Sequence, residues 1–148
     1  MSEARPPRQI LRSTGAVLAG ALEIVVLSIG TDVLMNAAGV FPALGQPMSD
    51  SLLLLATAYR TAYGVAGSFL AARLAPGRPM THALVLGLIG LALSILGAVA
   101  TWGKGPAYGH EWYPLALVAL AIPSAWLGGK LRVMQSGARV TPSEIAKP

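Results

Sequence analysis

Two charged residues lie inside long apolar stretches, and they are the positions where this sequence could do chemistry. Glu23 interrupts the apolar residues 13–35, and Arg60 interrupts residues 51–74. A carboxyl group can bind and release a proton or hold a cation, whereas a guanidinium can bind an anion or neutralise the carboxylate. Ionisable residues are costly inside a membrane, so they generally pair with one another or mark an ion, proton or substrate pathway.

We expect Glu23 and Arg60 to form an ion pair with each other. At 1.5 Å of rise per residue, Glu23 lies roughly 16 Å from a membrane boundary near Arg12, and Arg60 lies about 17 Å from the same face. On antiparallel neighbouring helices the two charges would meet near the middle of the membrane. Asp32 would lie closer to the opposite surface and is expected to be a poorer partner. The pair would act as a staple that fixes helix register or as part of a transport pathway.

Other polar side chains near Arg60 could complete such a site. Hydroxyl groups that could hydrogen-bond to the pair belong to Tyr59, Tyr63, Thr57 and Thr61. The sequence contains no cysteine, and its two histidines, His82 and His110, are expected on opposite sides of the membrane. No phosphate-binding loop and no nucleophile elbow is present. We therefore expect no enzymatic activity, no metal and no cofactor.

Four apolar stretches must position these residues. Of the 148 residues, 54% are hydrophobic and 11% are charged, whereas a soluble domain carries about 25% charged residues. About 20 apolar residues are needed to cross a bilayer, and the sequence offers residues 13–35, 51–74, 83–102 and 112–131. Glycine and proline between them predict short loops. We expect an all-α fold in which residues 1–132 form one membrane domain, an antiparallel bundle of four transmembrane helices, and residues 133–148 form a flexible cytoplasmic tail.

The distribution of lysine and arginine predicts the orientation of the helices. With the N-terminus in the cytoplasm, nine of the 11 basic residues lie on the cytoplasmic side, Lys104 lies on the other side and Arg60 lies within a span. Short cytoplasmic loops carry such an excess, and anionic lipids attract basic flanks. The net charge of +5 is therefore expected to reflect contact with the lipid bilayer and not with nucleic acid. We expect a multi-pass protein of the inner (plasma) membrane with both termini in the cytoplasm.

Small residues indicate where the helices pack. Within residues 83–102 they recur at spacings of three and four, which places on one helical face Gly87, Gly90, Ser94 and Gly97. Small residues let membrane helices approach closely, because burying apolar surface gains little against lipid. This face predicts a tight seam, and the same kind of face could bind a second copy of the chain or another membrane protein.

Several segments resemble a family of small bacterial inner-membrane proteins with four helices. The resemblance rests on residues 58–64 (AYRTAYG), 71–76 (AARLAP), 78–84 (RPMTHAL) and 125–131 (AWLGGKL), which cover the last three expected spans. It implies an inner-membrane location and four helices. It implies no particular activity.

Residues 21–24 (ALEI) are also similar to the membrane site of the small multidrug resistance transporters. Those short four-helix proteins act as dimers, and a cationic drug competes with protons for one essential carboxylate in the first helix. This chain departs from them at Arg60, which would neutralise Glu23. We therefore expect a non-catalytic helix-bundle interaction or accessory protein. The alternative is a small ion- or proton-coupled transporter that acts as an oligomer, with Glu23 as proton carrier and Arg60 tuning it.

Overall fold

A computed structural model of the chain describes residues 7–137, which form four long helices joined by short loops. Helix α1 spans Pro7–Ala37, α2 spans Asp50–Leu74, α3 spans Pro79–Thr101 and α4 spans Trp112–Gly137. A single turn of 3-10 helix, η1 (Pro106–Tyr108), precedes α4. Residues 7–137 contain no strand, so the expected all-helical fold is confirmed.

Three segments are long and apolar enough to cross a membrane. They are Pro7–Ala37, Pro79–Thr101 and Pro106–Gly137, which indicates a membrane protein. Helix α2 is not among them, because Arg60 and several glycine, serine, threonine and tyrosine residues lower its hydropathy.

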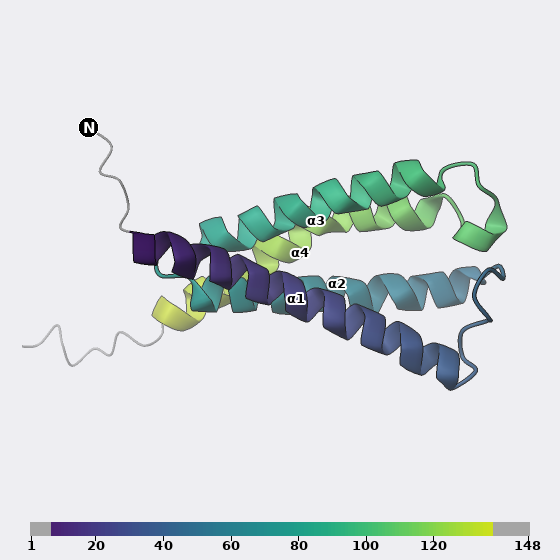
Figure 1. Cartoon of the computed structure of the whole chain (residues 1–148), viewed down its shortest axis with the longest axis horizontal. Helices are drawn as coiled ribbons and strands as arrows, with labels where there is room; N and C mark the ends of the chain where they lie inside the picture. Colours follow the sequence, from purple (N-terminus) through teal and green to yellow (C-terminus); the bar gives the residue numbers. More distant parts are fainter. Residues whose placement is uncertain (1–6, 138–148) are drawn as a thin grey trace, which may run out of the picture.

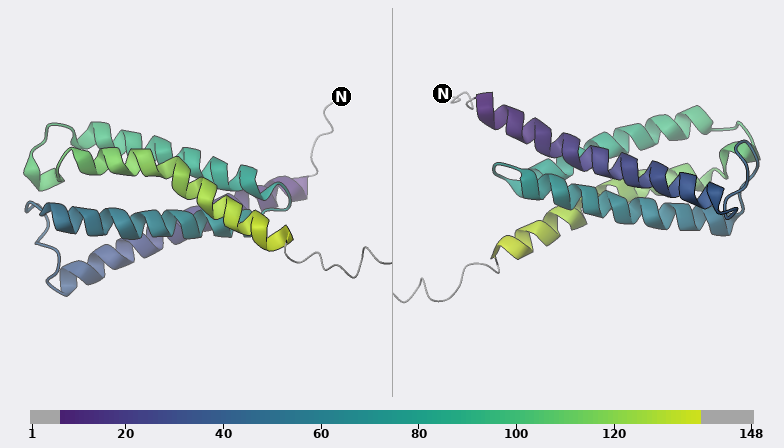
Figure 2. Two further views of the ribbon diagram at one scale, coloured as in Figure 1. Left: turned by 180° about the vertical axis from the view of Figure 1, so that it is seen from behind. Right: turned by 60° about the horizontal axis from the view of Figure 1, so that its bottom comes forward.

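The helices form two hairpins, α1–α2 and α3–α4, whose axes run along the length of the molecule (Figure 1). At one end lie the start of α1, the end of α4 and the short α2–α3 connection; we call it the terminus end. At the other end lie the loops 38–49 and 102–111; we call it the loop end. The two hairpins converge toward the terminus end and separate toward the loop end (Figures 1 and 2).

Glycine permits direct backbone contact in the half of the bundle nearer the terminus end. A Cβ atom on Gly20 or on Gly67 would overlap the backbone of the other residue, so α1 and α2 cross at this pair. A Cβ atom on Gly128 of α4 would overlap the backbone of α2 at Val65 and Phe69. Close approach through glycine is a common way for membrane helices to associate.

The packing face expected on α3 forms a close contact at one of its positions only. A Cβ atom on Gly87 would overlap the Cβ of Ala125 in α4. At Gly90 and Gly97 no atom of another helix lies within 4 Å of the Cβ position, and Ser94 borders a cavity. The continuous seam expected along this face is therefore wrong beyond Gly87. Residue spacing determines which face of the helix carries small residues. It does not determine the crossing angle between the hairpins, which increases their separation toward the loop end.

Some helix ends also differ from those expected. Helix α4 continues to Gly137, so residues 133–137 belong to a helix and not to a tail, and residues 138–148 lie outside the described residues. Helix α3 begins at Pro79. Proline is favoured at the first helical position, because the N–H that it lacks would have no hydrogen-bond partner within the helix there.

Candidate functional site

An ion pair joins α1 to α2 on the loop-end side of their glycine contact. The Nη2 of Arg60 donates to Oδ2 of Asp32, and the hydroxyl of Tyr59 donates to Oδ1 of the same carboxylate. The Arg60 guanidinium also lies 5.9 Å from the centre of the Tyr59 ring. Both oxygens of Asp32 are therefore bound from α2, and the positive charge of Arg60 is balanced.

The expected pair between Glu23 and Arg60 is wrong. Arg60 binds Asp32 instead, and Oε2 of Glu23 is buried without a hydrogen-bond partner among the described residues. The reason is side-chain direction, since Cα–Cβ bonds tilt toward the N-terminus of a helix. Because α1 and α2 are antiparallel, Arg60 leans toward the loop end and Asp32 leans to meet it, whereas Glu23 leans away. A prediction based only on the depth of each Cα atom in the membrane therefore chose the wrong carboxylate as the partner of Arg60.

The four polar neighbours expected around Arg60 divide into two kinds. The tyrosines bind across helices: besides the contact of Tyr59 with Asp32, the hydroxyl of Tyr63 lies 2.8 Å from Oγ1 of Thr31. The threonines bind their own helix, since Thr57 donates to the carbonyl oxygen of Leu53 at 2.8 Å, and Thr61 donates to that of Thr57 at 2.7 Å. Only the tyrosines therefore join α2 to α1.

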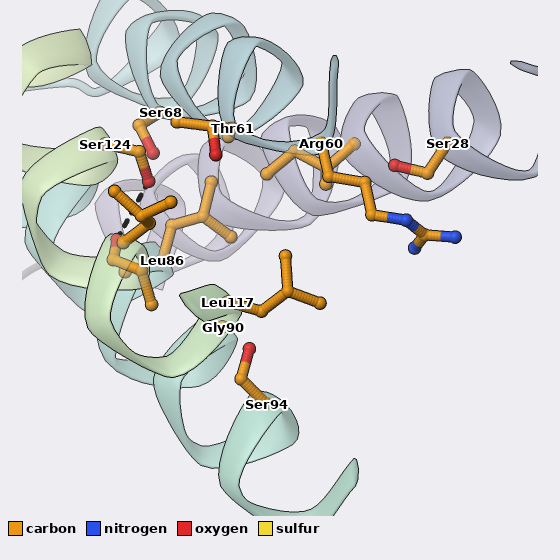
Figure 3. Close-up of a pocket in the computed structure, with 14 residues that line it drawn as sticks. Ser28, Arg60, Thr61, Ser68, Leu86, Gly90, Ser94, Leu117 and Ser124 are labelled. Carbon is orange, nitrogen blue, oxygen red and sulfur yellow. Dashed lines mark hydrogen bonds between the residues drawn. The ribbon is translucent and has the colours of Figure 1, made fainter. Parts of the chain in front are cut away.

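A cavity of about 180 Å³ lies between the four helices (Figure 3). Each helix contributes at least one hydroxyl group to its wall: Ser28, Thr61, Ser68, Ser94 and Ser124. Arg60 is the single charged residue among those that line it, and its guanidinium extends away from the Ser68 and Ser124 side (Figure 3). The centre of this apolar bundle therefore contains a hollow whose wall is mainly apolar but carries hydroxyl groups from every helix.

Three of these hydroxyl groups are available to a ligand. Thr61 and Ser124 donate to backbone carbonyl oxygens of their own helices. Ser28, Ser68 and Ser94 form no side-chain hydrogen bond within residues 7–137. These three come from α1, α2 and α3, so a small solute in the cavity could bind several helices at once.

A second hollow, of about 260 Å³, lies at the loop end. Asp32, Tyr59 and Arg60 form part of its wall, together with other residues of α1 and α2, residues of the two loops, and aromatic residues that include Phe41, Tyr108 and Tyr113. Arg60 lines both hollows. The Asp32–Arg60 pair therefore lies where the loop-end hollow and the central cavity meet.

Another polar cluster holds the two loops together at the loop end. One carboxylate oxygen of Asp50 lies 2.5 Å from Nδ1 of His110 and accepts a hydrogen bond from Nε1 of Trp112 at 2.7 Å. These contacts lower the pKa of Asp50, the His110 hydrogen bond most strongly, because they favour the charged carboxylate. This cluster is not predictable from the sequence, since Asp50 and His110 are 60 residues apart and neither belongs to a periodic pattern.

The arrangement can bind a small polar molecule, but it offers little else. Residues 7–137 contain no cluster of three His, Asp or Glu residues that could hold a metal ion, and the two histidines lie at opposite ends of the bundle. The chemistry available is hydrogen bonding from hydroxyl groups beside one balanced guanidinium. Comparison with known protein families, with curated proteins and with solved structures found no match to this chain.

Proposed function

We propose that the chain is a multi-pass inner-membrane protein in which all four helices cross the membrane and both termini lie in the cytoplasm. The packing of α2 against α1, α3 and α4 supports its inclusion, since a helix surrounded by other helices needs less apolar surface than one facing lipid. The orientation is supported by the basic residues at the terminus end: Arg8, Arg12, Arg73, Arg78, Lys130 and Arg132.

Within that membrane setting, the geometry favours transport of a small polar solute. The central cavity carries this proposal, because a bundle held together only by packing has no need of unpaired hydroxyl groups at its centre. A cavity of about 150 Å³ holds a benzene molecule, so the space here suits a solute of similar size. The loop-end hollow gives the route of entry, and the Asp32–Arg60 pair stands between it and the cavity. Four helices leave little room for a wide path, which favours an oligomer.

Glu23 is the candidate proton carrier in this proposal. An ion pair with Arg60 would neutralise the Glu23 carboxylate and prevent that role, but Arg60 is bound to Asp32 instead. The carboxyl of Glu23 lies on the same helix as Ser28, and one of its oxygens is buried without a partner among the described residues. Glu23→Gln should abolish uptake driven by a proton gradient in proteoliposomes while leaving the folded bundle intact.

The sequence provides a direct test of the cavity, because it contains no cysteine and each introduced thiol is unique. We expect Ser94→Cys to react with a small water-soluble methanethiosulfonate, since Ser94 borders the cavity. The matched variant Leu93→Cys should stay unmodified, because Leu93 is 63% exposed on the outside of the bundle, where lipid excludes water. Equal protection of both thiols would contradict transport through this cavity.

A second candidate function is an interaction or accessory protein. It is favoured by Gly97, which is exposed and has no atom of another described element within 4 Å of its Cβ position, so this part of α3 is free to pack against another membrane helix. Gly97→Leu should then reduce self-association or partner capture in a crosslinking assay. Ala92→Leu is the matched control, because Ala92 is exposed on a different face of α3. Unchanged association in Gly97→Leu would remove this candidate.

A further inference from the structure

A polar hollow of about 230 Å³ lies at the terminus end, remote from the cavity and from the Asp32–Arg60 pair. It is formed by the start of α1, the α2–α3 connection and the first turn of α3. Besides Pro76 and Gly77, its walls consist of polar or charged residues: Gln9, Ser13, Arg78, Thr81 and His82. The first turn of α3 adds the positive end of that helix's dipole. This hollow therefore suits an anion.

An apolar groove continues from the hollow along the outside of the bundle. The groove has a volume of about 390 Å³ and shares Ser13, Thr81 and His82 with the hollow. Its remaining walls come largely from apolar side chains of α1 and α3: Val17, Leu18, Val85 and Ile89. From Thr81 to Ile89 the groove follows α3 for about 12 Å toward the middle of the membrane.

The charges at this end of the molecule complement an anion. Neither the hollow nor the groove has a carboxylate in its wall. The described acidic residues Asp32, Asp50 and Glu111 lie toward the loop end, and Glu23 lies within α1 between the two ends. Arg78 contributes a cation to the hollow itself, and further arginines flank it near the ends of α1 and α2.

The side chain of His82 places a polar ring in the wall of the hollow. Its side chain belongs to both the hollow and the groove, yet the residue is only 9% exposed. Nδ1 lies 3.1 Å from the carbonyl oxygen of Arg78, and Nε2 has no hydrogen-bond partner within residues 7–137. A carbonyl oxygen only accepts, so Nδ1 is the donor in this contact, and Nε2 is left to accept a hydrogen bond from a hydroxyl group of a ligand in the hollow.

We propose that the hollow and the groove together bind one anionic phospholipid from the leaflet on the terminus side. The phosphate would lie among Arg78, Ser13 and Thr81, a hydroxyl group of the headgroup would donate to Nε2 of His82, and one acyl chain would follow the groove between α1 and α3. Basic hollows between membrane helices are suited to anionic headgroups. A soluble phosphate compound would use the hollow alone, whereas a lipid accounts for the hollow and for the groove that leaves it.

The test is native mass spectrometry of the full chain released from detergent, with dioleoyl phosphatidylglycerol and dioleoyl phosphatidylcholine as competing lipids. We expect one phosphatidylglycerol to be retained in preference to phosphatidylcholine. Arg78→Gln should lower the affinity for phosphatidylglycerol about fivefold. Arg132→Gln, a basic residue at the same end but outside both walls, should leave it unchanged. Equal retention of the two lipids, or equal loss in both variants, would show general attraction to the basic end and overturn the proposal.

A second variant tests the groove without altering charge. Val85→Trp places a bulky ring in the groove and should reduce phosphatidylglycerol retention, whereas Val99→Trp, at a residue of α3 that is 72% exposed and outside the groove, should not. Glycerol phosphate, which has no acyl chain, should fail to displace the lipid. Full displacement by glycerol phosphate, or no effect of Val85→Trp, would identify a soluble phosphate ligand and contradict the lipid.

Discussion

At the terminus end the helices meet through glycine, whereas at the loop end they are joined by polar side chains. Gly20, Gly67 and Gly128 bring backbones into direct contact, and such contacts cannot loosen without separating whole helices. Toward the loop end the hairpins diverge, and side-chain contacts such as Arg60 with Asp32 connect the elements. Water or a solute can replace a polar side-chain contact. We therefore infer that the loop end is the part of the bundle that can open and that the glycine contacts are its fixed base.

The largest effect should come from filling a glycine contact. Gly67→Leu would push a side chain into the backbone of α1 at Gly20, and we expect a loss of about 3 kcal/mol or more in the free energy of unfolding. Thermal unfolding in detergent would measure it. Gly30→Leu is the matched control on α1, because no atom of another element lies within 4 Å of its Cβ position. Equal melting temperatures for the two variants would show that the glycine contact is not the fixed base.

A smaller effect should follow from removing a polar contact between α1 and α2. Tyr63→Phe deletes the hydrogen bond to Thr31, and hydrogen bonds between membrane helices contribute about 0.6 kcal/mol on average. Thr57→Val provides the comparison, since Thr57 binds only the backbone of its own helix and should contribute less to holding the helices together. A Thr57→Val variant that weakens association of the hairpin more than Tyr63→Phe would contradict this assignment.

The smallest effect should be a dependence of stability on acid at the loop end. Contacts with His110 and Trp112 lower the pKa of Asp50 from its ordinary value of 3.8. The folded carboxylate therefore binds protons less readily than the unfolded one, so its contribution is fully present above that ordinary pKa and is lost as the pH falls through the lowered value. In melting experiments between pH 7 and pH 3, Asp50→Asn should flatten this part of the decline. An unchanged decline would place the acid sensitivity elsewhere.

Much of the helical architecture is predictable from the sequence. Long apolar stretches are bounded by glycine and proline, and proline at the first position of α3 and a glycine-rich loop after Thr101 fix the ends of that helix. The presence of hydroxyl groups near Arg60 is also predictable from the sequence, because Tyr59 and Tyr63 lie within one helical turn of it. These features depend on local sequence alone.

The partner of Arg60 and the cavity depend on geometry that residue spacing does not contain. Asp32 could have been found by considering the tilt of side chains in antiparallel helices. The cavity could not, because the divergence of the hairpins decides whether Gly90 and Ser94 meet another helix or face a hollow. The contact of Asp50 with His110 links two segments without periodicity, so it follows only from the path of the loops.

The most direct test of the account is a pair of double-mutant cycles on unfolding in detergent, one for Arg60→Leu with Asp32→Leu and one for Arg60→Leu with Glu23→Leu. Double-mutant cycles isolate the interaction between two side chains. The Arg60 and Asp32 side chains are 32% and 35% exposed, so we expect a coupling energy of only about 1 kcal/mol for that pair. Arg60 and Glu23 should show none. Coupling of Arg60 to Glu23 and not to Asp32 would contradict the assignment of Asp32 as the partner of Arg60. It would also contradict the role of Glu23 as a free proton carrier and the transport function that depends on that role.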